Sequence, residues 1–391
     1  MKKQTLLLLA IILLGLNLRP VLAAVGPLLD RIQLDTHLGH VGASLLTSLP
    51  IVIMGLGALA ATFLRGRLGE RRGIWLGTLL IALACLTRGL LPSATPLLIS
   101  ALLAGAGIAF VQALLPGLIK ARFSQDAGRL IGFYSCAIMG GAAFGAALTP
   151  WLAQWLGWAW ALAAWAVPAI VACAVWKRAA PADEPTANNS AAPLNPWRSP
   201  RAWLLMAFFG VGTAGYTLVL AWLTPYYTSL GWSAESSGLL LAALTLCEVA
   251  AGLLASSLLA RCPDRRVLLG FVLVCLLLGL IALVVAPLAL VVVICVLIGI
   301  GIGALFPLSL VVAQDHLDDP RQTGDLLAFV QGGGYLIAAT SPLLAGLLRQ
   351  YANDLRLSWL MMAAATLLLM LMAARFKPGS GHFRTHGVGQ A

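Results

Sequence analysis

The stretch "RGRLGERRGIWLG", residues 65–77, decides the fold, because a related stretch recurs half a chain later. The second copy is "ARCPDRRVLLG", residues 260–270, and its acidic residue and two arginines at 264–266 stand 194 positions after those at 70–72. Two glycine-rich runs, "GAGIAF" from Gly105 and "GIGIGA" from Gly299, are separated by the same 194 positions. In a chain of 391 residues this offset is close to half the length, so it predicts a duplicated unit.

Long apolar stretches fill the sequence between these loops. The chain is 60% hydrophobic and only 10% charged, which is more apolar surface than a soluble core can hide. A bilayer is crossed by about 20 apolar residues in a helix, and lipid requires every backbone group to pair internally. Twelve helical spans are therefore expected, at 5–29, 41–63, 74–91, 95–119, 130–153, 158–176, 202–228, 236–260, 267–286, 289–313, 326–348 and 357–375.

The basic residues behind the net charge of +11 lie mainly in the loops and tails between spans, so this charge does not indicate a nucleic-acid partner. If the amino terminus is inside, 20 of the 25 lysines and arginines fall in inside loops and tails. The exceptions are Arg19, Arg31, Arg88, Arg349 and Arg356. This bias predicts that both termini are cytoplasmic and that the first span is retained as a membrane helix.

The spans divide into two sets of six. We expect an N-terminal six-helix bundle at 1–176, a cytoplasmic linker at 177–201, a C-terminal six-helix bundle at 202–376 and a cytoplasmic tail at 377–391. The linker is rich in Pro, Ala, Asn and Ser, which is typical of a flexible connection. Two bundles that rock about a central site are the geometry of secondary transporters. The predicted fold class is an all-α membrane protein with two pseudo-symmetric bundles.

The twelve spans, the basic loops after spans two and eight and the long linker resemble the major facilitator superfamily. The stretch "RGRLGERRG" is a degenerate copy of that family's signature between spans two and three, with Gly66 where an aspartate is usual. The resemblance implies gating roles for residues in the two copies of the loop, namely Arg67, Gly69, Arg71, Asp264 and Arg265.

Four further stretches resemble one branch of the superfamily, which contains cyanate and 2-nitroimidazole transporters. They are "GLNLRPVLAAVGPLL" (15–29), "VQALLPGLIKARF" (111–123), "GYTLVLAWLTPYY" (215–227) and "LLAFVQGGGYLIA" (326–338). The resemblance implies a monomeric secondary active transporter in the bacterial inner (plasma) membrane that moves a cyanate-like anion by alternating access.

Arg19 is the strongest candidate for binding the solute. An arginine at the centre of a span costs about 2.5–3.5 kcal/mol on insertion scales, so something must compensate its charge. Pro20 permits a kink or local unwinding, and Asn17 supplies a donor and an acceptor beside it. We favour an anion-binding role, because a planar guanidinium forks onto small anions. The alternative is a permanent clamp that holds helices together.

Glu248 is the one acid at the middle of a span. Three roles are open for its carboxyl group: a coupling site that takes up a proton, a structural partner of Arg19, or a protonated hydrogen-bond donor that never cycles.

Other polar and aromatic side chains inside spans are weaker candidates for the substrate site. They are Gln112, Tyr134, Tyr216, Trp222 and Gln331. Hydrogen bonds between helices explain mid-span amides about as well as ligands do. Two further expectations concern the membrane interface: Tyr226 and Tyr227 belong to an aromatic belt, and Arg88 extends to the interface.

The sequence shows no sign of enzymatic or nucleotide-driven chemistry. It lacks the GxxxxGK[ST] motif that cradles phosphates, and its seven cysteines show neither metal-site nor disulfide spacing. We expect no enzyme activity, no cofactor and no metal. The expected partners are a small-molecule substrate, the lipid bilayer and protons as the candidate coupling ion. The alternative function is proton-coupled efflux of nitroaromatic or drug-like compounds.

Overall fold

The computed structural model describes residues 2–123, 126–181, 195–258, 262, 264–317 and 320–376. Within these residues the chain forms fifteen α-helices and two short 3-10 helices and no strand, so the predicted all-α class is confirmed. The elements of the first half are α1 (Lys2–Leu18), α2 (Pro20–Ala23), η1 (Gly26–Leu28), α3 (Leu29–Thr36), α4 (His40–Leu59), α5 (Ala61–Leu90), α6 (Ala94–Arg122), α7 (Ala127–Ala163) and α8 (Ala166–Ala179). Those of the second half are η2 (Pro196–Arg198), α9 (Pro200–Ser229), α10 (Ala234–Leu258), α11 (Arg265–Val285), α12 (Val291–Gln314), α13 (Pro320–Ala338), α14 (Thr340–Ala352) and α15 (Arg356–Ala373).

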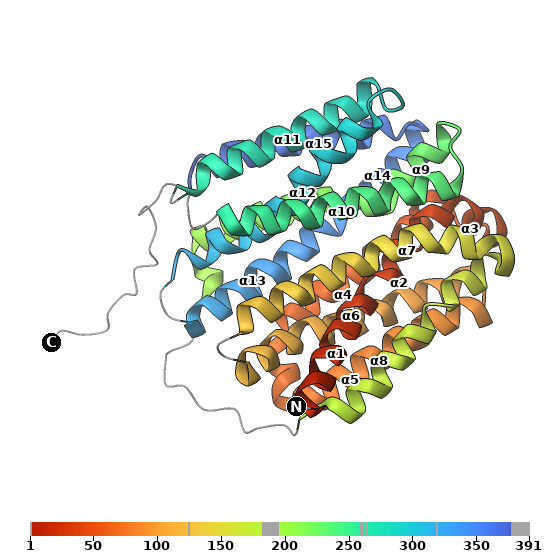
Figure 1. Cartoon of the computed structure of the whole chain (residues 1–391). Helices are drawn as coiled ribbons and strands as arrows, with labels where there is room; N and C mark the ends of the chain where they lie inside the picture. The colour runs from red at the N-terminus through yellow and green to blue at the C-terminus, as the bar shows by residue number, and fades with distance from the viewer. Residues whose placement is uncertain are drawn as a thin grey trace.

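The two halves of the chain lie side by side, with the red-to-yellow helices of the first half below the green-to-blue helices of the second (Figure 1). Each half repeats the same packing: α6 packs against α4 and α5, and α12 packs against α10 and α11. Gly105 of α6 lies against Pro50 of α4, while Gly299 of α12 lies against Leu244 and Cys247 of α10. The glycines of the sequence repeat therefore sit at equivalent close contacts between helices. The predicted linker falls largely outside the described residues, and the predicted tail falls wholly outside them.

Eleven helices among the described residues are long and apolar enough to cross a membrane. The twelfth expected span, 158–176, is interrupted instead of forming one long helix: it comprises the end of α7 and the 14-residue α8. Gly157, with φ 76° and ψ 161°, turns the chain between the fifth and sixth spans. Gly69, with φ 70° and ψ 170°, does the same between the second and third spans. Both turns need a glycine because other residues rarely adopt such a positive φ.

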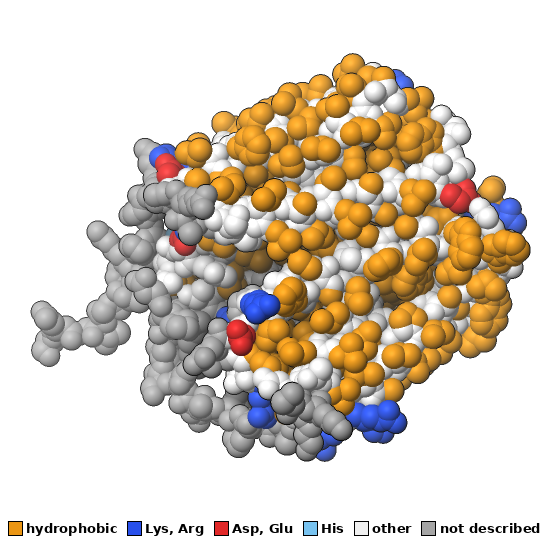
Figure 2. All heavy atoms as spheres, viewed as in Figure 1, with side chains coloured by type: hydrophobic (Ala, Val, Ile, Leu, Met, Phe, Trp, Pro, Cys, Tyr) orange, Lys and Arg blue, Asp and Glu red, His pale blue; other side chains and the backbone are white. Residues whose placement is uncertain are grey.

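The surface between the two ends of the bundle is apolar. Figure 2 shows hydrophobic side chains covering the visible face, with Lys, Arg, Asp and Glu near its ends. Large apolar side chains on this surface, such as Val292 on α12 and Leu371 on α15, are strongly exposed. An exposed apolar belt of this extent is stable in lipid rather than in water.

The first span is broken where the sequence predicts it. Helix α1 ends at Leu18, Arg19 adopts φ −106° and ψ −24°, and α2 begins at Pro20. The ring of Pro20 has no N–H to continue the helical ladder. The carbonyl of Leu16 therefore loses its usual donor. The carbonyl of Arg19 begins the next helix by accepting from the N–H groups of Leu22 at 3.0 Å and Ala23 at 2.9 Å. The expected kink is confirmed, and Arg19 lies at it.

We call the end of the bundle where α1 and α9 begin and α8 and α15 end the basic end. The described basic residues there are Arg67, Arg71, Arg72, Lys120, Arg122, Arg129, Lys177, Arg178, Arg198, Arg201, Arg265, Arg266 and Arg375. The other end is called the opposite end, and its loops follow α3, α5, α9, α11 and α14.

Candidate functional site

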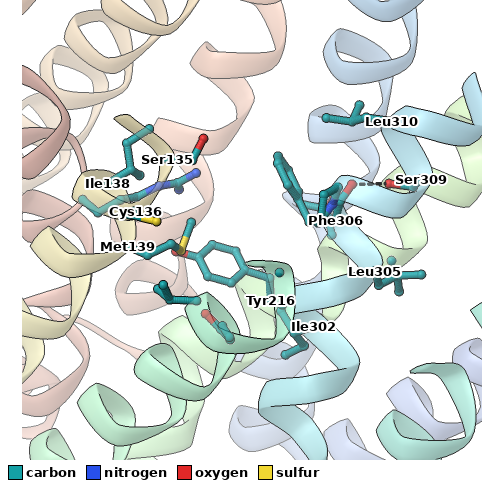
Figure 3. Close-up of a pocket in the computed structure, with 18 of the residues that line it drawn as sticks. Ser135, Cys136, Ile138, Met139, Tyr216, Ile302, Leu305, Phe306, Ser309 and Leu310 are labelled. Carbon is teal, nitrogen blue, oxygen red and sulfur yellow. Dashed lines mark hydrogen bonds between the residues drawn. The ribbon is translucent and has the colours of Figure 1, made fainter. Parts of the chain in front are cut away.

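A cavity of about 470 Å³ lies between the two halves. Its lining comes from the break between α1 and α2 and from α4, α6, α7, α9, α10, α12 and α13. Figure 3 shows Ser135, Cys136, Ile138 and Met139 of α7 on one side, Ile302, Leu305, Phe306, Ser309 and Leu310 of α12 on the other, and the ring of Tyr216 extending between them. Both halves therefore contribute to one central site, as the rocking-bundle hypothesis requires.

The cavity extends towards the basic end. Its lining includes Ile131 and Ser135 near the start of α7, Ser256 near the end of α10 and Leu310 near the end of α12. Each of these positions lies on a part of its helix that approaches the basic end.

The halves meet closely at the opposite end. Thr228 of α9 donates to Asp30 of α3 at 2.6 Å, and Arg349 of α14 lies 3.4 Å from the same carboxylate. Gln154 of α7 donates to Glu235 of α10 at 2.8 Å. The site is thus approached from the basic end and covered at the opposite end.

Arg19 reaches the cavity from the break in the first span. Its side chain is only 5% exposed, and no acid of the described residues lies within ion-pair distance of it. The guanidinium carbon lies 5.3 Å from the centre of the Tyr216 ring, and Nε has no hydrogen-bond partner in the described structure. The face of an aromatic ring attracts a cation but does not neutralise it. Arg19 therefore faces the cavity without a salt bridge, and Glu248 in the same lining is the described acid whose charge acts on it.

Three tyrosines surround this guanidinium. Tyr216 and Tyr335 line the cavity, and Tyr134 lies just behind it with its ring close to Gly15. The hydroxyls of Tyr134 and Tyr216 have no hydrogen-bond partner in the described structure. Hydroxyl groups can both donate and accept, so that of Tyr216, which lines the cavity, is available to an incoming polar solute.

Tyr335 is a candidate that the sequence interpretation missed. It follows Gln331 by four residues in "QGGGY", so both residues lie on one face of α13. That spacing could have identified it, because Gln331 was already a candidate. The structure includes Tyr335 in the cavity lining and leaves half-buried Gln331 out of it.

Glu248 lines the same cavity from α10, on the side of the C-terminal half. It is 4% exposed and forms no hydrogen bond or ion pair within the described residues. The proposed structural pairing with Arg19 is therefore not seen in this conformation. Gly303 of α12 packs directly on the backbone of Glu248, where a side-chain carbon would collide. This close approach holds the α10 backbone at Glu248 firmly beside α12.

Four candidates lie outside the cavity lining: Tyr134 and Gln331, described above, and Asn17 and Trp222. The amide of Asn17 donates to Leu13 at 2.7 Å and to Pro168 of α8 at 3.2 Å, so its N–H groups join helices within the first half. Trp222 is fully buried and donates to the carbonyl of Pro342 at 3.0 Å. Gln112, in contrast, lines the cavity from α6 as expected.

The structure contradicts the two interface expectations. Arg88 does not extend to the membrane surface but is 1% exposed; its Nε and Nη1 donate to groups inside the first half, and its Nη2 has no described partner. Tyr226 and Tyr227 are also buried, and they donate to the carbonyls of Leu283 and Pro287. Buried hydrogen-bond acceptors near the helix ends bind these polar groups in place of interfacial water.

The first of the two loops predicted to gate transport is ordered by contacts at the basic end. Gly69 makes the turn described above, Arg67 lies over the ring of Phe63 at 4.9 Å, and Arg71 donates to the carbonyl of Lys177 at 3.5 Å. These contacts stay within the first half of the chain.

The second loop predicted to gate transport leads into α11. Asp264 caps the helix by accepting from the backbone N–H of Arg266 at 3.0 Å and pairs with its guanidinium at 2.7 Å. These hydrogen bonds hold the pKa of Asp264 below its ordinary value. Arg265 pairs with Asp315 after α12 at 3.0 Å. The two copies of the repeat thus use different local contacts, and their gating roles stay predictions.

No group of three His, Cys, Asp or Glu side chains is arranged to hold a metal ion anywhere in the described ranges.

Comparison with known proteins agrees with this architecture. The sequence profile of the Major Facilitator Superfamily matches residues 6–323 and 214–388. The cyanate transport protein CynX of Escherichia coli (strain K12) is 41% identical over 374 residues, which cover 95% of this chain and 97% of that protein. The 2-nitroimidazole transporter of the same organism is 30% identical over 379 residues, covering 96% of this chain and 95% of that one.

A solved structure shows the same fold. The xylose transporter XylE from Escherichia coli, in an inward open conformation, superposes with a TM-score of 0.77 over 96% of this chain and 97% of its own, at 14% identity. The resemblance stated from the sequence is confirmed by these matches, and the chain is a membrane transporter that belongs to the Major Facilitator Superfamily.

Proposed function

We propose that this protein is a secondary active transporter that moves a small anion, cyanate or a similarly small planar compound, across the bacterial inner membrane. The proposal rests on one observation above all: Arg19 stands buried beside the central cavity without an acidic partner in the described structure. A buried cation without an acidic partner favours the binding of an anion, because the anion neutralises its charge.

The balance of buried charge supports an anion over a neutral solute. Arg19 and Arg88 are both buried in the first half, and Glu248 is the buried acid among the described residues. If all three are ionised, the interior carries an excess of one positive charge. A guanidinium forks onto small planar anions through two parallel hydrogen bonds, and the Tyr335 and Tyr216 hydroxyls can add to this binding.

Alternating access would operate between the two halves. We propose that 1–176 and 202–376 move against each other, that the basic end is cytoplasmic and that both termini are on that side. The described conformation then opens the cavity to the cytoplasm and covers it on the outside. Movement of the halves would separate α3 from α9 and α14 while closing the path at the basic end.

Glu248 is the proposed proton-coupling site. It shares the cavity with Arg19 but comes from the other half. An anion and a proton that enter together leave the net charge of the cavity unchanged, and Glu248 is the described acid able to hold that proton there. This charge balance favours symport of the anion with a proton.

A second function has its own observation in support. The cavity of about 470 Å³ is much larger than cyanate, and apolar side chains such as Met54, Met139 and Phe306 form much of its lining. A volume of this size holds roughly fifteen waters at about 30 Å³ each, so it also accommodates a nitroaromatic ring. Proton-coupled efflux of such compounds is therefore the alternative, as the 30% identical 2-nitroimidazole transporter suggests.

Transport by purified protein in proteoliposomes tests both functions. Radiolabelled cyanate is offered with and without an imposed pH gradient, and 2-nitroimidazole is added as a competitor. We expect saturable cyanate uptake above that of protein-free vesicles, increased by a gradient with the outside acidic. Saturable transport of 2-nitroimidazole with no transport of cyanate would reject the small-anion proposal and support the alternative.

A further inference from the structure

A second buried arginine, Arg88 of α5, lies in the first half but outside the cavity lining. It is 1% exposed, so its guanidinium is removed from both lipid and water. Its position contributes nothing to the surface of the site. A charge so costly to bury is expected to serve a role in the membrane interior.

The contacts of Arg88 join two other segments of the chain. Its Nη1 donates to the carbonyl of Val21 in α2 at 2.6 Å, and its Nε donates to Ser100 Oγ of α6 at 3.0 Å. Ser100 in turn donates to the carbonyl of Leu97 at 2.6 Å. Arg88 thus links α6 to the short helix that follows the break at Arg19.

The break is the reason why the Val21 carbonyl needs this donor. In a continuing α-helix the N–H of Val25 would donate to Val21. Here it donates to Leu22 at 3.2 Å, because α2 ends at Ala23 and the chain tightens before η1. An unpaired carbonyl inside a membrane protein is costly, and Arg88 supplies the missing donor.

We propose that Arg88 is a positioning residue for solute binding: it holds the Val21 carbonyl and thereby fixes the broken segment 19–28 so that Arg19 faces the cavity. The inference rests on the proposed function in that Arg19 binds the solute. Lysine would not serve equally, because a single ammonium group does not present a planar fork to acceptors on two different helices. Arg88 would act through Arg19 and would not contact the solute.

Amide hydrogen exchange of the purified full chain in detergent tests whether Arg88 fixes the segment 19–28, and this measurement needs no ligand. The variants are Arg88→Lys and Arg88→Leu, and Ser100→Ala is the matched control because it leaves the contact with Val21 in place. We expect amides of 19–28 to exchange about tenfold faster or more in both Arg88 variants, since a charge-assisted bond is lost. Ser100→Ala should change them little. Unaltered exchange in 19–28 in Arg88→Lys would overturn the proposal.

If Arg88→Leu does not fold, Arg88→Lys, which keeps the charge, decides the result. Faster exchange spread evenly over all helices would indicate a general packing role and would also overturn the proposal.

Measurement of cyanate binding then distinguishes a positioning role of Arg88 from a role in protein stability alone. We expect Arg88→Lys to weaken cyanate binding about tenfold, and the double variant Arg19→Lys/Arg88→Lys to bind no more weakly than Arg19→Lys alone. Losses that add in the double variant would show that Arg88 does not act through Arg19. If the parent protein binds neither cyanate nor 2-nitroimidazole, the proposed function fails, and the exchange of 19–28 alone decides the positioning role.

Discussion

Asp30 and Arg349 are 319 positions apart in the chain, yet their side chains meet 3.4 Å apart where the two halves close over the cavity. Thr228 donates to the same carboxylate at 2.6 Å, and Arg349 also lies over the ring of Trp222 at 5.4 Å. This cluster joins α3 of the first half to α9 and α14 of the second. We call this cluster the latch; in the alternating-access mechanism proposed above, it would have to open before a solute could pass.

Removing the latch should favour the conformation that opens at the opposite end. Asp30→Asn weakens the ion pair and the hydrogen bond from Thr228, but a partly exposed pair contributes only about 0–1 kcal/mol. We therefore expect a shift of several-fold in the population of the two conformations. Spin labels at Leu34→Cys on α3 and Tyr351→Cys on α14, both strongly exposed, measure the separation of the halves.

The matched control is Arg31→Gln, which breaks the Arg31–Asp35 pair within α3 and leaves the latch intact. An identical distance distribution in Asp30→Asn and the parent would show that the latch does not hold the halves together.

Substitution of Arg19 should reduce binding without preventing insertion. Arg19→Lys keeps the charge but loses the fork, so we expect cyanate affinity to fall about tenfold or more, and Arg19→Ala should lose it almost entirely. Cyanate-induced thermal stabilisation in detergent measures the effect, with exposed Arg72→Ala as a control. If Arg19 is a structural clamp, both variants will unfold at lower temperature while cyanate still stabilises them as much as it does the parent.

Glu248→Gln should abolish the coupling of transport to protons while leaving cyanate binding intact. The amide cannot take up a proton, so accumulation of cyanate driven by a pH gradient should disappear while exchange of cyanate across the membrane continues. Asp354→Asn is the control, because this exposed acid lies between α14 and α15 and accepts from the backbone N–H of Arg356 within the second half. Undiminished gradient-driven accumulation in Glu248→Gln would remove Glu248 from the mechanism.

Asp264 should make a contribution to stability that depends on pH in the acidic range. Its hydrogen bonds from Arg266 lower the pKa of the folded carboxyl, so the stabilisation is complete above the unfolded pKa of about 3.9. It is lost as the pH falls through the lower folded pKa. Thermal unfolding in detergent at neutral and strongly acidic pH should therefore show a smaller difference between parent and Asp264→Ala in acid.

Asp264→Asn keeps a side-chain oxygen that caps α11 but loses the ion pair, so it should be less harmful than Asp264→Ala at neutral pH. Equal losses in both variants at neutral pH would show that the cap is not the stabilising part of this contact.

The topology prediction is independent of the site. Cysteines introduced as Asn189→Cys and Gln390→Cys should react only with reagents that reach the cytoplasm, whereas His37→Cys should react from outside. The first two positions lie outside the described residues, so this prediction depends on the charge bias of the sequence. Labelling of Asn189→Cys by an impermeant outside reagent would contradict the twelve-span arrangement.

The sequence alone determined the membrane class, the internal repeat and the break in the first span. Long apolar stretches can be satisfied only by helices in lipid, and Pro20 interrupts the helical ladder whatever surrounds it. The sequence also identified Arg19, Tyr216, Gln112 and Glu248, because a polar group inside an apolar stretch is conspicuous without any structure. These four residues do line one cavity.

Only the tertiary structure decided which way the remaining side chains face. Helices that are apolar on all sides carry little periodic signal, so their sequence does not say which neighbour each face meets. Asn17 finds its acceptor on α8, Trp222 on α14 and Arg88 on α2, at separations of 151, 120 and 67 positions. The role of each polar group depends on a carbonyl brought to it from a distant segment, and that juxtaposition is created by helix packing.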